Sequence, residues 1–298
     1  MANEKKVHHT HRVTVFETIA IILLGILGLV TLYPFYYVVI VSFSNLNAFG
    51  NHVPYMLPYV IDLEGYQVVL GDDSFLRSFL NSVFVTVVGT AVNMFLSVFG
   101  AYALSKKRLI GRGLILSIIL FTMLFSGGLI PFYLVVSGLG LTNSMWSMIF
   151  PTAINTFYLI IMKNYFASLP PSLEEAAKID GAHDLTILFQ IILPISLPFV
   201  ATFFLFYAVE RWNEWWNALL FINEKAKQPL QIYMRDLLVT YNAQLAQQAQ
   251  MMLSKDQKSN FQAIQMATIV ISTVPILCVY PFIQKHFVRG VMVGSIKE

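Results

Sequence analysis

Charge is what this sequence has little of. Only 12% of its 298 residues are charged, 57% are hydrophobic, and the mean hydropathy is +0.67. A typical soluble domain carries about 25% charged residues, so the composition excludes a soluble enzyme. The single cysteine excludes an internal disulfide and a thiolate metal cluster. A net charge of +3 is too small to indicate a nucleic-acid-binding surface.

Long uncharged runs take the place of the missing charge. A bilayer core of about 30 Å is crossed by about 20 apolar residues in a helix. Six runs of about this length occur: Ile19–Val41, Phe79–Leu104, Leu114–Leu139, Met145–Met162, Ile191–Val209 with an extension toward Phe221, and Ala263–Gln284. The sequence therefore predicts an all-α membrane protein with six transmembrane helices.

The basic residues predict the orientation of these helices. Most of the 19 lie on one side if the amino terminus is cytoplasmic: Lys5, Lys6, Arg12, Lys106, Lys107, Arg108, Arg112, Lys163, Lys178, Lys285, Arg289 and Lys297. Basic residues in short loops favour the cytoplasmic side. We therefore expect a cytoplasmic amino-terminal segment (1–18), a transmembrane domain (19–285) and a cytoplasmic tail (286–298), with both termini inside.

The predicted external loop, residues 222–261, is the most polar long segment. Tyr233, Leu237, Leu238, Tyr241 and Leu245 are spaced so that they form an apolar stripe on one face of a helix within 230–252. This helix can fold back on the membrane bundle, or it can dock an external partner. In the second case Tyr233, Leu237 and Tyr241 would contact that partner.

The loop between the fourth and fifth runs, residues 168–190, predicts a short helix-turn-helix. Pro171 and Ser172 mark a helix start, and Ser172 with Glu175 has the spacing of a capping box. Gly181 permits a turn, after which the helical pattern resumes. Both helices are too short to cross a membrane, so we expect them at the inner surface. These features alone also fit an ordinary amphipathic connection.

The residue string of this loop resembles the EAA loop of ATP-binding-cassette (ABC) importer permeases. It reads Glu175-Ala176-Ala177, then Asp180-Gly181-Ala182, then Ile192-Leu193-Pro194 and Pro198. In that family the loop forms a coupling helix that docks on a cytoplasmic ATPase subunit. The resemblance implies coupling roles for Glu174, Glu175, Ala176, Ala177, Asp180 and Gly181.

Other strings resemble the carbohydrate branch of these permeases, which includes the smaller maltose-permease subunit and the LplC/YtcP-type permeases of complex oligosaccharides. They are Ser126-Gly127-Gly128-Leu129-Ile130-Pro131, Leu139-Gly140-Leu141-Thr142-Asn143-Ser144, Trp212-Asn213-Glu214, and Gly290 to Lys297. The resemblance implies a type I importer permease in a bacterial cell membrane. It implies a second permease subunit, two cytoplasmic ATPase subunits that hold ATP and Mg²⁺, an extracytoplasmic solute-binding protein and a carbohydrate substrate.

Charged residues at the end of the fifth run need an explanation, because a charge at bilayer depth costs about 2.5–3.5 kcal/mol. Their spacing places Glu210, Arg211 and Glu214 near one helical face and predicts an Arg211–Glu214 pair. These charges can lie at the outer interface, within an aromatic belt that includes Trp215.

Alternatively, the same region lines a sugar path. Trp212 and Trp216, four residues apart, would stack on a sugar ring while Asn213 or Glu214 accepts hydroxyl bonds. Asn155 and Tyr158 are weaker candidates, since an Asn in a helix bundle usually bonds a neighbouring helix. The residues Gly127, Gly128 and Pro131 predict a kink in the third run.

No string of residues predicts catalysis. A P-loop and an H-E-x-x-H string are absent from the sequence, so hydrolysis of ATP must come from a partner. We expect no catalytic residue, no metal and no cofactor in this chain. The expected function is ATP-driven alternating access for a carbohydrate, with an oligosaccharide favoured. The alternatives are an ABC permease for another solute, such as an amino acid or an ion, and an ATP-independent secondary transporter or channel.

Overall fold

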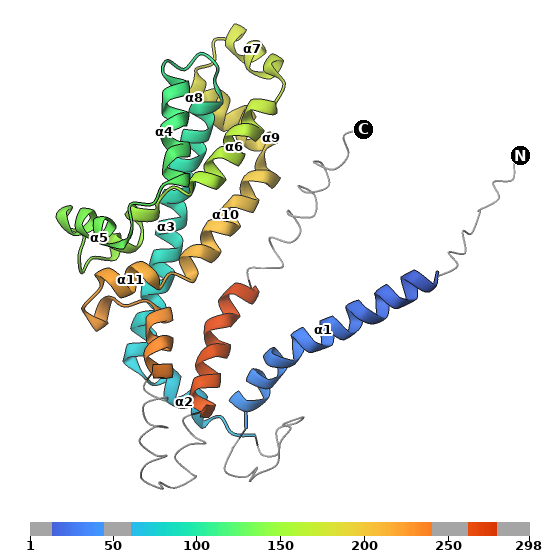
Figure 1. Ribbon diagram of the computed structural model, residues 1–298, viewed down its shortest axis with the longest axis vertical. Coiled ribbons are helices and arrows are strands. Elements are labelled where there is room, and N and C mark those ends of the chain that lie inside the picture. Colours follow the sequence, from blue (N-terminus) through green and yellow to red (C-terminus); the bar gives the residue numbers. More distant parts are fainter. Residues whose placement is uncertain (1–13, 45–60, 240–261, 279–298) are drawn as a thin grey trace, which may run out of the picture. The chain divides into compact units, whose positions relative to one another are not determined.

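The computed structural model describes residues 14–44, 61–239 and 262–278 (Figure 1). This part of the chain is helical, and its β-structure is limited to one bridge between Ser44 and Ile61. The chain divides into two compact units, residues 1–67 with 253–270, and residues 68–252 with 271–298. The first unit holds the predicted first span, and the second holds the candidate site.

The first unit is built on α1 (Val15–Ser42), which Thr14 and Glu17 begin with a capping box. At 1.5 Å per residue its 28 residues extend about 42 Å, more than a bilayer core of about 30 Å. Its apolar side chains are exposed along almost the whole helix, as suits contact with lipid. Where α1 ends, Phe43 stacks on Tyr66 of α2 (Glu64–Leu70) at 4.8 Å between ring centroids.

The second unit is organised around α3 (Asp73–Ser105), along which α6 (Thr156–Ser168) and α10 (Leu197–Trp212) pack. The three helices share a core of buried side chains, among them Val98, Ala101, Leu159, Met162 and Phe203. Inside this core the hydroxyls of Ser97 and Tyr207 share a hydrogen bond of 2.7 Å. The first and second predicted runs, which lie in α1 and α3, are therefore continuous helices.

The third run is broken into α4 (Arg112–Leu124) and α5 (Leu129–Gly138), and Figure 1 shows α5 turned away from the axis of α4. The break lies at residues 125–128, where Gly128 has φ +86°, in the left-handed region that favours glycine. The predicted change of direction at Gly127 and Gly128 is confirmed. The interpretation of Leu114–Leu139 as a single transmembrane helix is wrong, because the run forms two helices.

The fourth and fifth runs are bent. The fourth consists of η1 (Met145–Met148), η2 (Phe150–Thr152) and α6, with a bend of 49°. The fifth lies in the π-turn η3 (Leu188–Ile192), α9 (Leu193–Ile195) and α10. Together with the preceding α8 (Asp184–Ile187), it is bent by 88° next to Pro194 and Pro198.

The count of six spans stays a prediction. In the part of the chain that the structure describes, two helices are long and apolar enough to cross a membrane, or four if each bent pair forms one span. The sixth run is described as the apolar helix Gln262–Cys278. The predicted cytoplasmic tail and most of the amino-terminal segment lie outside the described residues.

After α10 the chain forms α11 (Trp216–Phe221), η4 (Lys225–Lys227) and a helix over residues 230–239. The predicted helix within 230–252 is confirmed over these last ten positions, where Leu238 of the predicted apolar stripe is exposed. Residues 240–252, with Tyr241 and Leu245, lie outside the described residues.

Candidate functional site

The predicted coupling segment contains α7 (Pro171–Ile179), a turn, and α8. Gly181 has φ +79°, and its N–H donates to the Lys178 carbonyl, while the Ala182 N–H donates to the Ala177 carbonyl at 2.9 Å. These bonds satisfy carbonyls at the end of α7, as in a glycine-terminated helix. The helix-turn-helix and the turn at Gly181 are therefore confirmed.

The predicted capping box at Ser172 is wrong. The helix begins two residues earlier than this box requires, with Pro171 as its first residue and Pro170 as the N-cap, and no side chain caps it. Proline suits the first helical position because its fixed φ matches the helix and its missing N–H is not needed there. Ser172 lies inside the helix, where it cannot act as the N-cap.

The candidate coupling residues lie on two faces of α7. Ala177 is buried and Glu174 is half-buried, so both face the protein's own helices. Exposed residues form the other face and the turn: Glu175, Ala176, Ile179, Asp180 and Gly181. Ile179 is 86% exposed, an unusual position for a large apolar side chain unless a partner covers it.

Ion pairs connect this segment to the end of α3. Lys106, the C-cap of α3, bonds Glu174, and its Nζ lies 3.8 Å from the centroid of the Tyr102 ring. Burial lowers the pKa of Lys106, although the hydrogen bond from its ammonium to Glu174 opposes this shift. Arg108 binds Asp184 of α8 at 2.5 Å.

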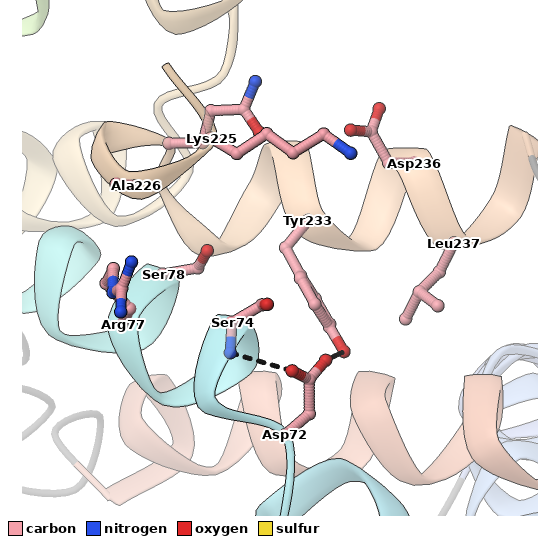
Figure 2. Close-up of a pocket in the computed structure, with 10 residues that line it drawn as sticks. Asp72, Ser74, Arg77, Ser78, Lys225, Ala226, Tyr233, Asp236 and Leu237 are labelled. Carbon is pink, nitrogen blue, oxygen red and sulfur yellow. Dashed lines mark hydrogen bonds between the residues drawn. The ribbon is translucent and has the colours of Figure 1, made fainter.

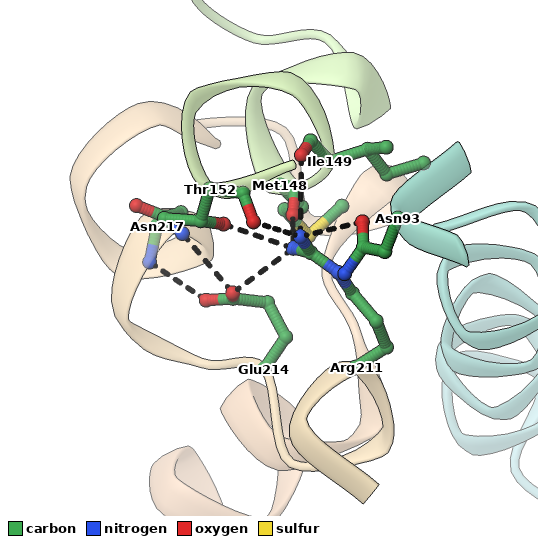
Figure 3. Close-up of polar contacts among 7 residues, drawn as sticks. All are labelled: Asn93, Met148, Ile149, Thr152, Arg211, Glu214 and Asn217. Carbon is green, nitrogen blue, oxygen red and sulfur yellow. Dashed lines mark hydrogen bonds and ion pairs between the residues drawn. The ribbon is translucent and has the colours of Figure 1, made fainter. Parts of the chain in front are cut away.

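A buried arginine holds the broken fourth run against α10. Arg211 is 4% exposed, and its guanidinium donates to the carbonyls of Met148, Ile149 and Thr152 at 2.5, 3.3 and 2.6 Å (Figure 3). It also donates to the Thr152 hydroxyl at 3.0 Å and to Asn93 Oδ1 of α3 at 3.1 Å. Arg211 thus satisfies carbonyls that the interruption of the helix leaves free.

Glu214 belongs to the same buried cluster. Its Oε2 lies 3.8 Å from Arg211 Nη1, which confirms the predicted pair. The carboxylate also accepts hydrogen bonds from the backbone and side-chain N–H groups of Asn217 at 2.9 and 3.0 Å (Figure 3). Both carboxylate oxygens therefore have protein partners, which leaves Glu214 better suited to holding α10 and α11 together than to binding a sugar hydroxyl.

An apolar groove of about 480 Å³ lies beside Tyr158 and Glu210, lined by residues of α3, α6, α10 and the last described helix. The Tyr158 hydroxyl donates to Glu210 Oε1 at 2.7 Å. Asn155 is the N-cap of α6, and its side-chain oxygen accepts from the N–H groups of Phe157 and Tyr158. Glu210 points to Tyr158 rather than to Arg211.

The tryptophans do not share one helical face, because α10 ends at Trp212 and α11 begins at Trp216. Trp212 is buried, and its indole N–H donates to the Ser272 carbonyl at 3.3 Å. Asn213 donates from its side chain to the Val209 carbonyl at 2.9 Å. Trp216 is exposed and lines a separate uncharged cavity of about 530 Å³ with Ser126, Gly127, Gly128, Leu129, Pro131, Phe132 and Val135.

On the helix over 230–239, the Tyr233 hydroxyl donates to Asp72 Oδ2 at 2.7 Å (Figure 2). The centroid of the Tyr233 ring lies 5.7 Å from that of Phe75. Burial raises the pKa of the Asp72 carboxyl, but hydrogen bonds from Tyr233 and Ser74 outweigh it, so this pKa lies below its ordinary value. This contact supports the interpretation in which the helix folds back on the bundle. Leu237 is half-buried, and together with Asp72 and Tyr233 it lines a pocket of about 280 Å³.

Comparison with known proteins decides the family. Residues 93–293 match the family described as binding-protein-dependent transport system inner membrane component. The chain belongs to this family. The polygalacturonan/rhamnogalacturonan transport system permease protein YtcP of Bacillus subtilis (strain 168) is 45% identical over 270 residues, 91% of this chain and 94% of the relative. Protein LplC of the same strain is 44% identical over 297 residues and matches 100% of both chains.

A solved structure agrees with this assignment. One chain of a bacterial ABC transporter involved in the import of the acidic polysaccharide alginate is 38% identical, with a TM-score of 0.82 over 92% of this chain and 96% of that chain. The present chain therefore has the permease fold of its family and is a membrane component of a transporter, not an enzyme. The resemblance found in the sequence is confirmed.

Several residues that organise this permease component were not predicted as site residues. Lys106 and Arg108 entered the sequence analysis only as markers of orientation, yet they bind the coupling segment. Gly89 and Asn93 are four residues apart on α3, and a Cβ at Gly89 would lie 2.9 Å from Arg211 Cδ. Their i, i+4 spacing is a weak signal that one face of α3 meets another helix.

Proposed function

We propose that this permease component is one of two membrane subunits of an ABC importer whose cargo is an oligosaccharide from an acidic polysaccharide. The relative YtcP is named for polygalacturonan/rhamnogalacturonan transport, and the similar solved structure is of a transporter involved in alginate import. Both names support an acidic glycan as cargo. ATP and Mg²⁺ would act on two cytoplasmic ATPase subunits. An extracytoplasmic solute-binding protein would deliver the cargo to the permease pair.

The observation that carries the proposal is the outward face of α7 and its turn. Glu175, Asp180 and the apolar side chain of Ile179 are exposed together, while Ala177 anchors the helix in the core. We assign this face, within residues 168–190, to the ATPase. The basic residues near it support a cytoplasmic position for the segment, with both termini on the same side and the loop 222–261 outside.

The cargo path follows from which candidates remain accessible. Trp216 offers an exposed aromatic face beside an uncharged cavity, a lining that suits the C–H face of a sugar and does not repel a uronate. Glu210 would repel a uronate in the groove beside Tyr158. A carboxylate at membrane depth is costly in lipid, so we assign this groove to the side of the chain that faces away from lipid. Asn155, Trp212, Asn213 and Glu214 would hold the helices that shape the path.

The external loop would meet the solute-binding protein. Arg77 and Lys225 are exposed at the rim of the pocket drawn in Figure 2, next to Tyr233 and Leu237. Because Tyr233 is bound to Asp72, we assign it to holding the loop in place rather than to direct contact. Leu237 and Tyr241 remain the proposed contacts with the partner.

Uptake into proteoliposomes tests the proposed cargo. The permease pair is reconstituted with its ATPase subunits and its binding protein, and uptake of a labelled oligogalacturonide is compared with that of a neutral oligosaccharide of equal length. We expect uptake of the acidic sugar only with ATP, and about tenfold or more lower uptake for Trp216→Ala, with Trp215→Ala as the matched control. Uptake of the neutral sugar alone would overturn the cargo, and uptake without ATPase subunits would overturn the importer.

A further inference from the structure

The contact between Lys106 and Glu174 is the most enclosed ion pair that joins the coupling segment to the membrane helices. Their side chains are 14% and 20% exposed, whereas those of Arg108 and Asp184 are 57% and 51% exposed. Exposed pairs contribute little to stability, but removing one partner of a buried pair leaves an unpaired charge at a high cost. The Lys106–Glu174 contact is therefore the firmer of the two connections.

The two adjacent glutamates of α7 lie in different surroundings. Successive residues of a helix point about 100° apart, so Glu174 meets Lys106 while Glu175 stays exposed. One residue can thus bind a protein outside the chain while the next holds α3. The ion pair connects α7 directly to the end of α3, so a force applied to the outer face of α7 acts on α3.

From this end, α3 reaches the buried cluster in the middle of the second unit. Asn93 lies twelve residues before Ser105, about 18 Å along the helix, and accepts a hydrogen bond from Arg211. Gly89 lies against the same arginine, and Ser97 bonds Tyr207 of α10. A displacement of α3 therefore acts on both the broken fourth run and α10.

We propose that the Lys106–Glu174 contact transmits movement between α7 and α3 and sets how much ATP is hydrolysed for each cargo molecule imported. This inference rests on the coupling function proposed for α7. The contact would keep α7 and α3 in one register while the ATPase subunits close. Without it, the ATPase could still bind α7 through Glu175 and Ile179, but its cycle would move the transmembrane helices less.

The test uses the complete transporter in proteoliposomes and measures ATP hydrolysed per cargo molecule imported. Lys106→Met and Glu174→Gln are each expected to raise this ratio at least fivefold, with complex assembly retained. A fivefold change corresponds to the lower end of the range of typical coupling free energies. The double variant Lys106→Glu with Glu174→Lys restores opposite charges and is expected to lower the ratio toward wild type. Lys107→Met, at the exposed neighbouring position, is the control and should keep the wild-type ratio.

Each outcome separates the inference from the proposed function. A wild-type ratio in both single variants, with uncoupling by Glu175→Ala, would overturn the transmission contact and leave the importer intact. A loss of assembly or ATPase activity in proportion to uptake, with no change in the ratio, would show a merely structural contact.

A further variant, Lys106→Arg, keeps the charge and decides the case in which the single variants do not assemble. A wild-type ratio in both Lys106→Arg and the charge-swapped double variant supports the inference. A raised ratio in both of them contradicts it. ATP-independent uptake by the wild type would instead refute the proposed function.

Discussion

Arg211→Met removes the guanidinium that holds the broken fourth run against α10. Methionine fills a similar volume but donates no hydrogen bond. The carbonyls of Met148, Ile149 and Thr152 lose their bonds from Arg211, and Glu214 loses the positive charge 3.8 Å away. We expect this variant to be the most destabilising single change in the second unit.

The magnitude follows from burial. Leaving one buried polar group without a partner costs about 1–3 kcal/mol, and breaking a buried charge pair costs about 3–5 kcal/mol. These costs are not additive, because the variant also removes the cost of burying Arg211 itself. We therefore expect a loss of about 3–5 kcal/mol, which lowers the thermal midpoint by about 6–20 °C at about 2–4 °C per kcal/mol. The loss of stability for Arg211→Lys should lie between zero and that for Arg211→Met, since lysine keeps the positive charge but cannot reproduce the planar set of N–H donors of arginine.

Thermal unfolding of the permease complex in detergent measures this change. Arg235→Met is the matched control, because Arg235 is exposed and lies 3.5 Å from Asp236, and its effect should stay within about 0.5 kcal/mol. A midpoint of Arg211→Met within 2 °C of wild type would refute the reasoning. It would mean that the carbonyls at the break find other donors.

Three further changes probe other parts of the permease. Tyr233→Phe should destabilise by about 1 kcal/mol. Because the folded-state pKa of Asp72 is lowered, this difference should persist above about pH 4 and vanish in acid unfolding titrations as pH falls through it. Gly181→Ala meets no atom within 4 Å, so only its φ of +79° opposes it, and stimulated ATPase activity should fall severalfold. Trp216→Ala should raise the KM for cargo uptake with complex assembly unchanged.

The continuous helices could be predicted from sequence because their hydropathy has no competing signal. The runs Ile19–Val41 and Phe79–Leu104 each lie inside one helix. Hydropathy cannot show where an apolar run changes direction. The helix α4 ends at Leu124 and α5 begins after its N-cap Gly128, and the fifth run is bent by 88° although its residues are mostly apolar.

Within the site, the spacing of residues along the sequence predicted contacts between near neighbours but no contact between residues far apart in the sequence. The Arg211–Glu214 pair and the turn at Gly181 follow from neighbours in the sequence. The bond between Lys106 and Glu174 joins residues 68 positions apart, and that between Arg211 and Met148 joins residues 63 apart. Such pairs depend on how helices pack, which one sequence does not reveal. The capping box failed because Pro171 suits the first helical position better than Ser172 suits the cap.

The most direct test of the importer assignment is ATPase activity of the reconstituted transporter with and without cargo-loaded binding protein. Wild type, Glu175→Ala and Gly181→Asp are compared, with the fold of the membrane helices checked by circular dichroism. We predict stimulation by the loaded binding protein in wild type and its loss in both variants. Equal stimulation in all three would contradict the coupling role of α7, and transport without any ATPase subunit would contradict the importer itself.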